Sequence, residues 1–460
     1  MTHKTVNLNV PTLTRVEGEG AMRVSVRDGV VERVELEIYE PPRMFEAFLR
    51  GRHYTEPVDI TARICGICPV AYQMSSAHAM ESLAGVHPAG AIRELRRLLY
   101  CGEWIESHVL HMAFLHAPDF VGVDSGIEFA RQAPELMAEV LHLKKTGNRI
   151  MEVVGGRPIH PVNVRLGGFY RAPTRAELAG LLPDLERAHA GALALLRWVA
   201  TFEYPSIPAR LATDTEYVSL RHEDEYPFNE GRIVSNHGLD VSVAEFGERL
   251  HEYHVAHSTA LHAVLDGDER TGRRYQTGPL ARWMNCADLV PDSIRAVAEE
   301  LGVTPVETNP FRSILVRGLE TLWAVEESQR IVGSYAPPER PFLVVPAVAG
   351  IGHGCTEAPR GALYHRYEID AAGTILDAVI VPPTSQNQDA IEADLRDFVA
   401  SHLDLDDHTL GHRCEQVIRN YDPCISCATH FLRFSIDRHA PGSPTEPAGS
   451  AAPRRSPDLR

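Results

Sequence analysis

Two widely separated cysteine pairs are the residues of this chain best suited to chemistry. Cys65 and Cys68 form a Cys-x-x-Cys pair near the N-terminus, and Cys424 and Cys427 form a second near the C-terminus. A Cys-x-x-Cys turn directs two sulfurs at one point, and thiolates favour zinc, nickel, copper(I) or the iron of iron–sulfur clusters. Zinc ribbons keep their two pairs close together in sequence. The wide spacing therefore favours one shared metal site, with a structural zinc site or a redox disulfide as the alternatives.

Composition limits the classes of protein to which the chain can belong. Its 460 residues, 44% of them hydrophobic, are enough to bury a large core. The formal net charge of −17 argues against nucleic-acid binding, which usually needs a basic surface. We expect no membrane span, because no apolar run is long enough, and the polar residues 1–20 show no signal peptide. Eight cysteines are too few for a secreted disulfide scaffold.

Most of the chain between the two pairs shows the apolar spacing of amphipathic helices. Pro69 is placed to be the first residue of a helix, which would put Cys68 at a helix N-terminus, where the dipole favours a thiolate. Clusters of proline and glycine separate the longer helical stretches. These predicted helices cover residues 91–115, 134–154, 174–202, 244–265 and 312–332.

Two stretches alternate apolar and polar residues and predict β-hairpins instead. Residues 20–40 carry turn residues at 27–29, and residues 367–381 carry them at 370–373. We therefore predict an α+β, mainly α fold, with a large helical bundle core and small β-hairpins or sheets at its flanks. Residues 441–460 are rich in proline, serine, alanine and arginine, and we expect them to be disordered.

Five short motifs occur in an order that identifies a known family. Together they resemble the large, catalytic subunits of nickel–iron hydrogenases along nearly the whole chain. Each motif alone is weak, but all five with a cysteine pair at each end are specific. They are Arg15-Val16-Glu17-Gly18, Arg63-x-Cys65-Gly66-x-Cys68, Gly155-Gly156-Arg157, Glu357-Ala358-Pro359-Arg360-Gly361, and Asp422-Pro423-Cys424-x-x-Cys427-x-x-His430.

Two departures from the family pattern indicate a branch. Many members carry histidine where this chain has Tyr72, and membrane-bound members usually carry serine where it has Pro383. Both departures resemble the soluble, cytoplasmic, NAD(P)-linked branch that includes the sulfhydrogenase alpha subunits. The related complex I subunit lacks the four cysteines, so their presence implies active metal chemistry here.

The resemblance implies a nickel–iron centre that cleaves H2 reversibly into protons and electrons. In the family, four thiolates hold nickel, and two of them bridge to an iron that bears carbon monoxide and cyanide. By position, Cys65 and Cys424 would be terminal nickel ligands, and Cys68 and Cys427 would be the bridges. Cys424 is then one candidate for the base that takes the first proton.

Three more residues acquire catalytic or cofactor roles by resemblance. Arg360 is a second candidate base, although the pKa of a guanidinium is usually so high that the group stays protonated and cannot accept a proton. Its alternative role would be to donate hydrogen bonds to the cyanides. Thr384 could also bond a cyanide, although the neighbouring Pro383 departs from the pattern. Glu17 would be the first proton relay, whereas spacing alone predicts a surface glutamate at the start of a hairpin.

Glu46 and His430 match the family's ligands of a magnesium ion, which prefers oxygen donors and ordered waters. Without the resemblance, Glu46 would be a solvated helix charge. His430 is also where a maturation protease cuts members of the family. Residues 1–440 would thus form a single catalytic domain in which 431–440 begin the cleaved extension.

The resemblance also implies partners, because this chain shows no further motifs for iron–sulfur clusters or nucleotides. An iron–sulfur small subunit would accept the electrons, and flavin- and NAD(P)-binding diaphorase subunits would follow it. Nickel-insertion proteins and the maturation protease would be transient partners. Two alternatives remain: a hydrogenase of another branch with a deazaflavin acceptor, and a non-enzymatic zinc or disulfide scaffold.

Overall fold

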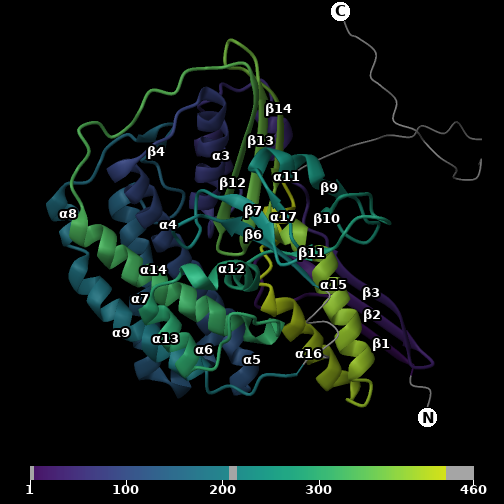
Figure 1. Cartoon of the computed structure of the whole chain (residues 1–460). Helices are drawn as coiled ribbons and strands as arrows, with labels where there is room; N and C mark the ends of the chain where they lie inside the picture. The colour runs from purple at the N-terminus through teal and green to yellow at the C-terminus, as the bar shows by residue number, and fades with distance from the viewer. Residues whose placement is uncertain (1–4, 207–214, 431–460) are drawn as a thin grey trace, which may run out of the picture.

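The computed structural model describes residues 5–206 and 215–430 of the chain, and helices make up most of its regular structure (Figure 1). One π-helical turn, η1 (His111–His116), and two 3-10 turns, η2 (Ala287–Leu289) and η3 (Pro310–Arg312), interrupt the α-helices. The α-helices are α1 (Phe45–Leu49), α2 (Pro57–Thr61), α3 (Pro69–Ala84), α4 (Gly90–Leu110), α5 (Ala117–Val121), α6 (Gly126–Gln132), α7 (Pro134–Gly155), α8 (Arg175–Ala179), α9 (Leu182–Val199), α11 (Val243–Arg249), α12 (Pro279–Cys286), α13 (Asp292–Glu300), α14 (Ser313–Ser334), α15 (Pro383–Ser401), α16 (Asp407–Asn420) and α17 (Ile425–Ala428).

The strands form small sheets rather than one large one. Their orders are β1-β2-β3, β4-β5, β11-β6-β7-β8, β9-β10 and β12-β13-β14. All pairings are antiparallel except that of β11 with β6. The strands are β1 (Val6–Val10), β2 (Gly20–Arg27), β3 (Val30–Ile38), β4 (Val164–Arg165), β5 (Gly168–Phe169), β6 (Glu216–Arg221), β7 (Arg232–Ser235), β8 (Asp240–Val241), β9 (Leu250–Tyr253), β10 (His262–Leu265), β11 (Tyr275–Gln276), β12 (Gly350–Ala358), β13 (Gly361–Ile369) and β14 (Ile375–Val381).

The long helices α4, α7, α9 and α14 pack into a bundle that holds the main apolar core (Figure 1). Helices α4 and α7 cross where two glycines face each other. A Cβ on Gly147 would lie 2.6 Å from the carbonyl oxygen of Gly102, closer than van der Waals contact permits. The two glycines therefore set the close approach of these helices, in keeping with the tight packing of protein interiors.

Two small sheets lie outside this bundle, and each packs on other helices. The β1-β2-β3 sheet packs on α15 and α16 around a second apolar core. The β12-β13-β14 sheet packs on α3, where a Cβ on Gly352 would lie 2.1 Å from the carbonyl oxygen of Ala79. This glycine thus lets β12 lie directly against the helix that follows the first cysteine pair.

The predicted mainly α fold with flanking sheets is confirmed. Strands β2 and β3 form the predicted hairpin around Asp28 and Gly29, and β13 and β14 form the second around residues 370–373. Four of the five long helical stretches are also present, although residues 174–202 divide into α8 and α9. The third strands, β1 and β12, were not predicted. Residues 431–460, which include the predicted tail, lie outside the described residues.

The helix predicted for residues 244–265 is wrong beyond residue 249. Helix α11 begins with a capping box between Ser242 and Glu245 but ends after about two turns. The chain then forms the β9-β10 hairpin, in which His262 pairs with Tyr253. All four residues of β10 are buried, and β10 packs on α15. This tertiary burial outweighs the helical spacing of the apolar residues.

Among residues 5–206 and 215–430, no helix combines the length and the apolar character that crossing a bilayer requires.

Candidate metal centre

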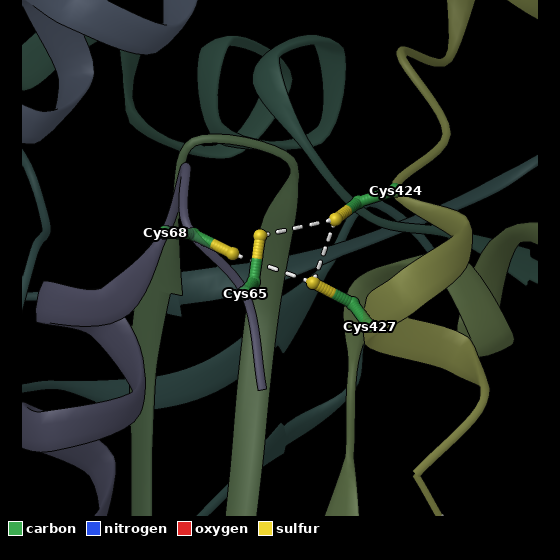
Figure 2. Close-up of side chains that lie close together, drawn as sticks. All are labelled: Cys65, Cys68, Cys424 and Cys427. Carbon is green, nitrogen blue, oxygen red and sulfur yellow. Dashed lines mark hydrogen bonds between the residues drawn. The ribbon is translucent and has the colours of Figure 1, made fainter. Parts of the chain in front are cut away.

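Four buried cysteine sulfurs, one pair from near each end of the chain, meet at one point of the fold (Figure 2). All four lie within 4.8 Å of one another. Cys65 Sγ is 3.4 Å from Cys424 Sγ, and Cys68 Sγ is 3.4 Å from Cys427 Sγ. The Sγ atoms of Cys424 and Cys427 are 2.8 Å apart. The predicted convergence of the two pairs, here called the four-cysteine group, is confirmed.

The first pair lies on the turn that leads into α3, and Cys68 is the residue that precedes this helix, as predicted. A carboxylate from α4 holds the first turn of α3. Glu103 accepts hydrogen bonds from the amides of Val70 at 2.6 Å and Ala71 at 3.2 Å. Burial raises the pKa of Glu103 well above its ordinary value. Glu103 thus fixes the helix end from which Cys68 projects.

The second pair is held by the N-terminal segment and by α15. The amide of Ile425 donates to the carbonyl of Glu17 at 3.0 Å, which forms a short parallel bridge between Glu17 and Cys424. The amide of Cys424 donates to Thr384 Oγ1, also at 3.0 Å. Thr384 lies in the first turn of α15 and is buried. Two distant parts of the chain therefore position Cys424.

Buried arginines lie beside the four-cysteine group. Arg360 Nε donates to the carbonyl of Asp422 at 2.7 Å, and its Nη2 donates to Asp422 Oδ1 at 3.1 Å. Arg317 Nη1 lies 3.6 Å from the other oxygen of the same carboxylate. Two guanidinium groups therefore share one carboxylate in a buried region. The charge of Arg360 favours the thiolate form of Cys65.

The two guanidinium groups differ in acidity. Burial lowers the pKa of Arg317 to about 10, an effect that Asp422 only partly offsets. Burial also disfavours the charged form of Arg360, but Asp422 and the neighbouring sulfurs hold its pKa well above the ordinary value. Arg360 is therefore suited to donating hydrogen bonds rather than to accepting a proton.

The acidities of the four thiols show that the pocket suits a cation. Hydrogen bonds from the other three sulfurs, led by that from Cys424, lower the pKa of Cys65 well below its ordinary value. Burial, followed by the hydrogen bonds of the other thiols, raises the pKa of Cys424 well above it. The protein alone thus stabilises one thiolate and resists further ionisation. A bound metal ion supplies the charge that ionises all its thiol ligands, so this donor set fits a soft metal.

Glu17 touches the four-cysteine group and leads away from it. Cys424 Sγ donates to Glu17 Oε2 at 3.1 Å, and the amide of Ser426 donates to the same oxygen at 3.0 Å. Ser426 Oγ in turn donates to Glu40 Oε1 at 3.2 Å. Both glutamates are half-buried. Glu17 is therefore neither enclosed in a dry pocket nor a free surface charge, and it links a cluster thiol to the outside.

Tyr72 lies on the first turn of α3 with its hydroxyl group buried. Burial raises the pKa of Tyr72 well above its ordinary value, and negative charge on Cys427 and Cys68 raises it further. The phenol is therefore neutral at physiological pH. It cannot exchange a proton near neutrality, as a histidine at this position could.

The structure also brings together the two predicted magnesium ligands. Glu46 Oε1 lies 3.9 Å from His430 Nε2, and backbone hydrogen bonds join residues 43–45 to residues 429–430. Burial lowers the pKa of His430 to about 4, so its ring is neutral. Yet its two nitrogens lie 2.6 and 2.7 Å from the carbonyl oxygens of Cys427 and Ile380. Since a neutral ring has one N–H, one nitrogen turns a lone pair toward a carbonyl, and a cation bound there would remove this conflict.

Each site residue expected from the sequence thus lies at or beside the four-cysteine group. Glu17, Thr384 and Arg360 border this group. Glu46 and His430 lie together, and the His430 ring contacts the backbone carbonyl of Cys427. Sequence reasoning missed Glu103 and Arg317. Buried charges on apolar helices leave no local signal, because their partners come from other elements.

Known proteins match nearly the whole chain. A family model described as nickel-dependent hydrogenase matches residues 43–157. The alpha subunit of sulfhydrogenase 1 from Pyrococcus furiosus is 30% identical over 430 residues, which cover 93% of this chain and 98% of that protein. An F420-non-reducing hydrogenase subunit from Methanothermobacter thermautotrophicus is also 30% identical, over 93% of this chain and 95% of its own. A solved NAD+-reducing NiFe hydrogenase in the H2-reduced state gives a TM-score of 0.83 at 26% identity, and covers 92% of this chain and 99% of that one.

Proposed function

Since the chain belongs to the family of nickel-dependent hydrogenase large subunits, we propose that its four-cysteine group holds a nickel–iron centre at which H2 is cleaved reversibly. The observation that carries the proposal is the meeting of four buried sulfurs with the Glu17 carboxylate on one of them. When bound, such a centre supplies the Lewis acid that polarises H2 and the metal ions that take up its electrons. The iron would carry carbon monoxide and cyanide.

The protein's own residues would divide the remaining work. Cys424 Sγ would accept the proton, and Glu17 would take it over the 3.1 Å contact between them. The Ser426 amide would hold this carboxylate in place, and the half-buried Glu17 would release the proton to solvent. Arg360, which stays protonated, would donate hydrogen bonds to the iron's ligands.

The assignment of terminal and bridging ligands rests on the resemblance, since the shortest of the three sulfur contacts, 2.8 Å, joins Cys424 to Cys427. Cys65 lies against Cys424, which would be the terminal pair, and Cys68 lies against Cys427, which would be the bridging pair. Thr384, whose hydroxyl oxygen accepts from the Cys424 amide, would position that cysteine and could still donate its own proton to a cyanide.

A magnesium ion would bind between Glu46 and His430. The carboxylate of Glu46, the carbonyl of Ile380 and the neutral ring of His430 provide two oxygen donors and one nitrogen donor. Magnesium favours oxygen ligands and retains waters at its other positions. The ion would tie the C-terminal end of the described chain to α1.

The electrons would pass to a small subunit with iron–sulfur clusters and then, through flavin-containing diaphorase subunits, to NAD(P). Tyr72 and Pro383 support this cytoplasmic, pyridine-nucleotide-linked branch, and so does the similarity to the NAD+-reducing enzyme. The F420-non-reducing enzyme is 30% identical to this chain, against 26% for the NAD+-reducing enzyme, and this keeps a different acceptor as the second candidate. The purified complex should form NAD(P)H under H2. Reduction of a dye but neither nucleotide would favour the second candidate.

Metal analysis and infrared spectroscopy of the purified complex test the metal centre. We expect about one nickel per chain, about one iron per chain beyond the iron of the partner's iron–sulfur clusters, and bands from carbonyl and cyanide ligands. Cys68→Ser should lose nickel and H2-dependent dye reduction. Cys414→Ser, which changes an equally buried but remote cysteine on α16, should retain both. Absence of both nickel and such infrared bands, with zinc lost on the Cys68→Ser substitution, would instead establish the scaffold alternative.

A further inference from the structure

A second group of metal-ligating side chains lies where the β9-β10 hairpin meets α15. It consists of His257 in the hairpin loop, His262 at the start of β10, and Glu392 on α15. One ligand atom from each residue lies within 4.8 Å of those of the other two. Imidazole nitrogens and a carboxylate are ligands for divalent first-row ions such as zinc. None of the three residues belongs to the four-cysteine group.

Hydrogen bonds orient the imidazole ring of His262 in the way that is usual for a metal-bound histidine. Its Nδ1 lies 3.0 Å from Asp389 Oδ1, and the hydroxyl of Tyr253 donates to the other oxygen of that carboxylate at 2.7 Å. A carboxylate accepts only, so Nδ1 carries the proton and Nε2 carries a lone pair. Carboxylates orient the ligand histidines of metal sites in this way.

The lone pair of His262 has no other use in the described structure. The residue is 1% exposed, and its Nε2 has no hydrogen-bond partner. A buried polar atom without a partner is unfavourable by about 1–3 kcal/mol. An ion bound between His262, His257 and Glu392 would give this nitrogen a partner.

The other two residues complete the site and leave it accessible. His257 Nε2 lies 2.8 Å from Glu392 Oε1, which also accepts from the amide of Leu36 on β3 at 2.9 Å. The His257 and Glu392 side chains are 16% and 18% exposed. An ion could therefore enter from solvent and replace the proton between them.

We propose that His257, His262 and Glu392 bind a structural divalent ion, zinc being the best match to two imidazoles and a carboxylate. Three protein ligands leave a fourth position for water. The ion would join the hairpin and α15 beside the strand that Glu392 already contacts. Because α15 begins beside Thr384, which holds Cys424, the second site would stiffen a support of the four-cysteine group.

Zinc content of the nickel-loaded complex tests the proposal, since its four-cysteine group is then occupied. After equilibration with Zn2+ and removal of loosely bound metal, the wild type should retain about one zinc per chain. His262→Gln and Glu392→Gln should lose it. His251→Gln, which changes an exposed histidine of β9 in the same hairpin, should retain it. Equal zinc in all four proteins would overturn the proposal.

A measurement on the wild type keeps the test decisive if the variants fail to fold. In a difference spectrum against the cobalt-free complex, bound Co2+ should show visible absorption typical of nitrogen and oxygen ligands, without the sulfur-to-cobalt charge-transfer bands of thiolate sites. Absence of bound Co2+ would refute the second site. Sulfur bands alone would also refute it and would separately show that the four-cysteine group lacks its nickel–iron centre.

Discussion

The substitution Arg282→Met should loosen the chain segment that leads to Arg360. Arg282 is fully buried on α12 and donates at 3.0 Å to each of the carbonyls of Ala358 and Pro359. Its other hydrogen bonds go to the carboxylates of two buried glutamates, Glu320 at 2.7 and 2.8 Å and Glu357 at 2.9 Å. Methionine has a similar size but none of these donors, so both carboxylates lose a positive partner.

The expected magnitude follows from the acidity of Glu320. Burial would raise its pKa, but Arg282 and then His108 lower it to about 2 from the ordinary 4.5. One pKa unit corresponds to about 1.4 kcal/mol. The network therefore stabilises the ionised Glu320 of the folded chain by roughly 3 kcal/mol. Removing one partner of a buried ion pair usually costs about 3–5 kcal/mol, so Arg282→Met should lower the free energy of unfolding by a similar amount.

The same change should reverse the pH dependence of stability. In the wild type, the contribution of Glu320 is fully present above pH 4.5 and is lost as the pH falls toward 2. Without Arg282, burial would hold the pKa of Glu320 above 4.5, and His108 at 2.9 Å could share the proton. The folded variant would then bind a proton that the unfolded chain releases. Its stability should therefore fall as the pH rises above 4.5.

Urea unfolding midpoints at about pH 5.5 and about pH 7.5 measure both effects. The deficit of Arg282→Met against the wild type should be larger at the higher pH. Arg197→Met is the control, because Arg197 pairs with Glu300 on the surface, where such pairs contribute less than about 1 kcal/mol. Equal midpoints for Arg282→Met and the wild type, or a deficit that shrinks at the higher pH, would refute the reasoning.

Three further changes have clear expectations. Glu17→Gln should lower H2-dependent dye reduction by about 10²–10⁴-fold, with nickel content unchanged. Glu19→Gln, which changes an exposed neighbour, should leave the rate unchanged. Full activity of Glu17→Gln would exclude the relay. Gly147→Ala should push α4 away from α7 and lower the free energy of unfolding by about 1–3 kcal/mol. Gly411→Ala, in open space on α16, should raise the free energy of unfolding by up to about 1 kcal/mol. Urea unfolding midpoints of the two variants and the wild type measure both effects. Removal of nickel from the matured complex should abolish H2 cleavage while circular dichroism stays unchanged, and retention of activity would contradict the metal assignment.

Much of the site could be predicted from the sequence because its residues stand in fixed local patterns. The two Cys-x-x-Cys pairs favour a metal site by spacing alone, whereas only the family resemblance of the motif around Glu17 places a carboxylate near it. Spacing favoured their meeting at one shared site but left alternatives open, since no local rule joins Cys65 to a residue 359 positions away. Here the resemblance to a family supplied what physical reasoning from the sequence could not.

The parts that escaped prediction depend on contacts between distant elements. Glu103 lies on a helix whose spacing predicted only packing, and its role comes from the amides of α3 that it meets. Charged residues are seldom fully buried, so exposure was the reasonable expectation. The β9-β10 hairpin was missed for the same reason, because α15 buries β10 and decides its structure.

Contacts between the two ends of the chain affect when metal can bind during synthesis. They are the bridge between Glu17 and Cys424 and the pairing of residues 43–45 with 429–430. A ribosome releases Cys65 and Cys68 early, when the partner sulfurs have not yet been synthesised. The half-built polypeptide can offer an incoming metal only two thiols of the four-cysteine group. Complete coordination becomes possible only after synthesis nears its end, so the architecture itself delays metal loading until almost the entire polypeptide exists.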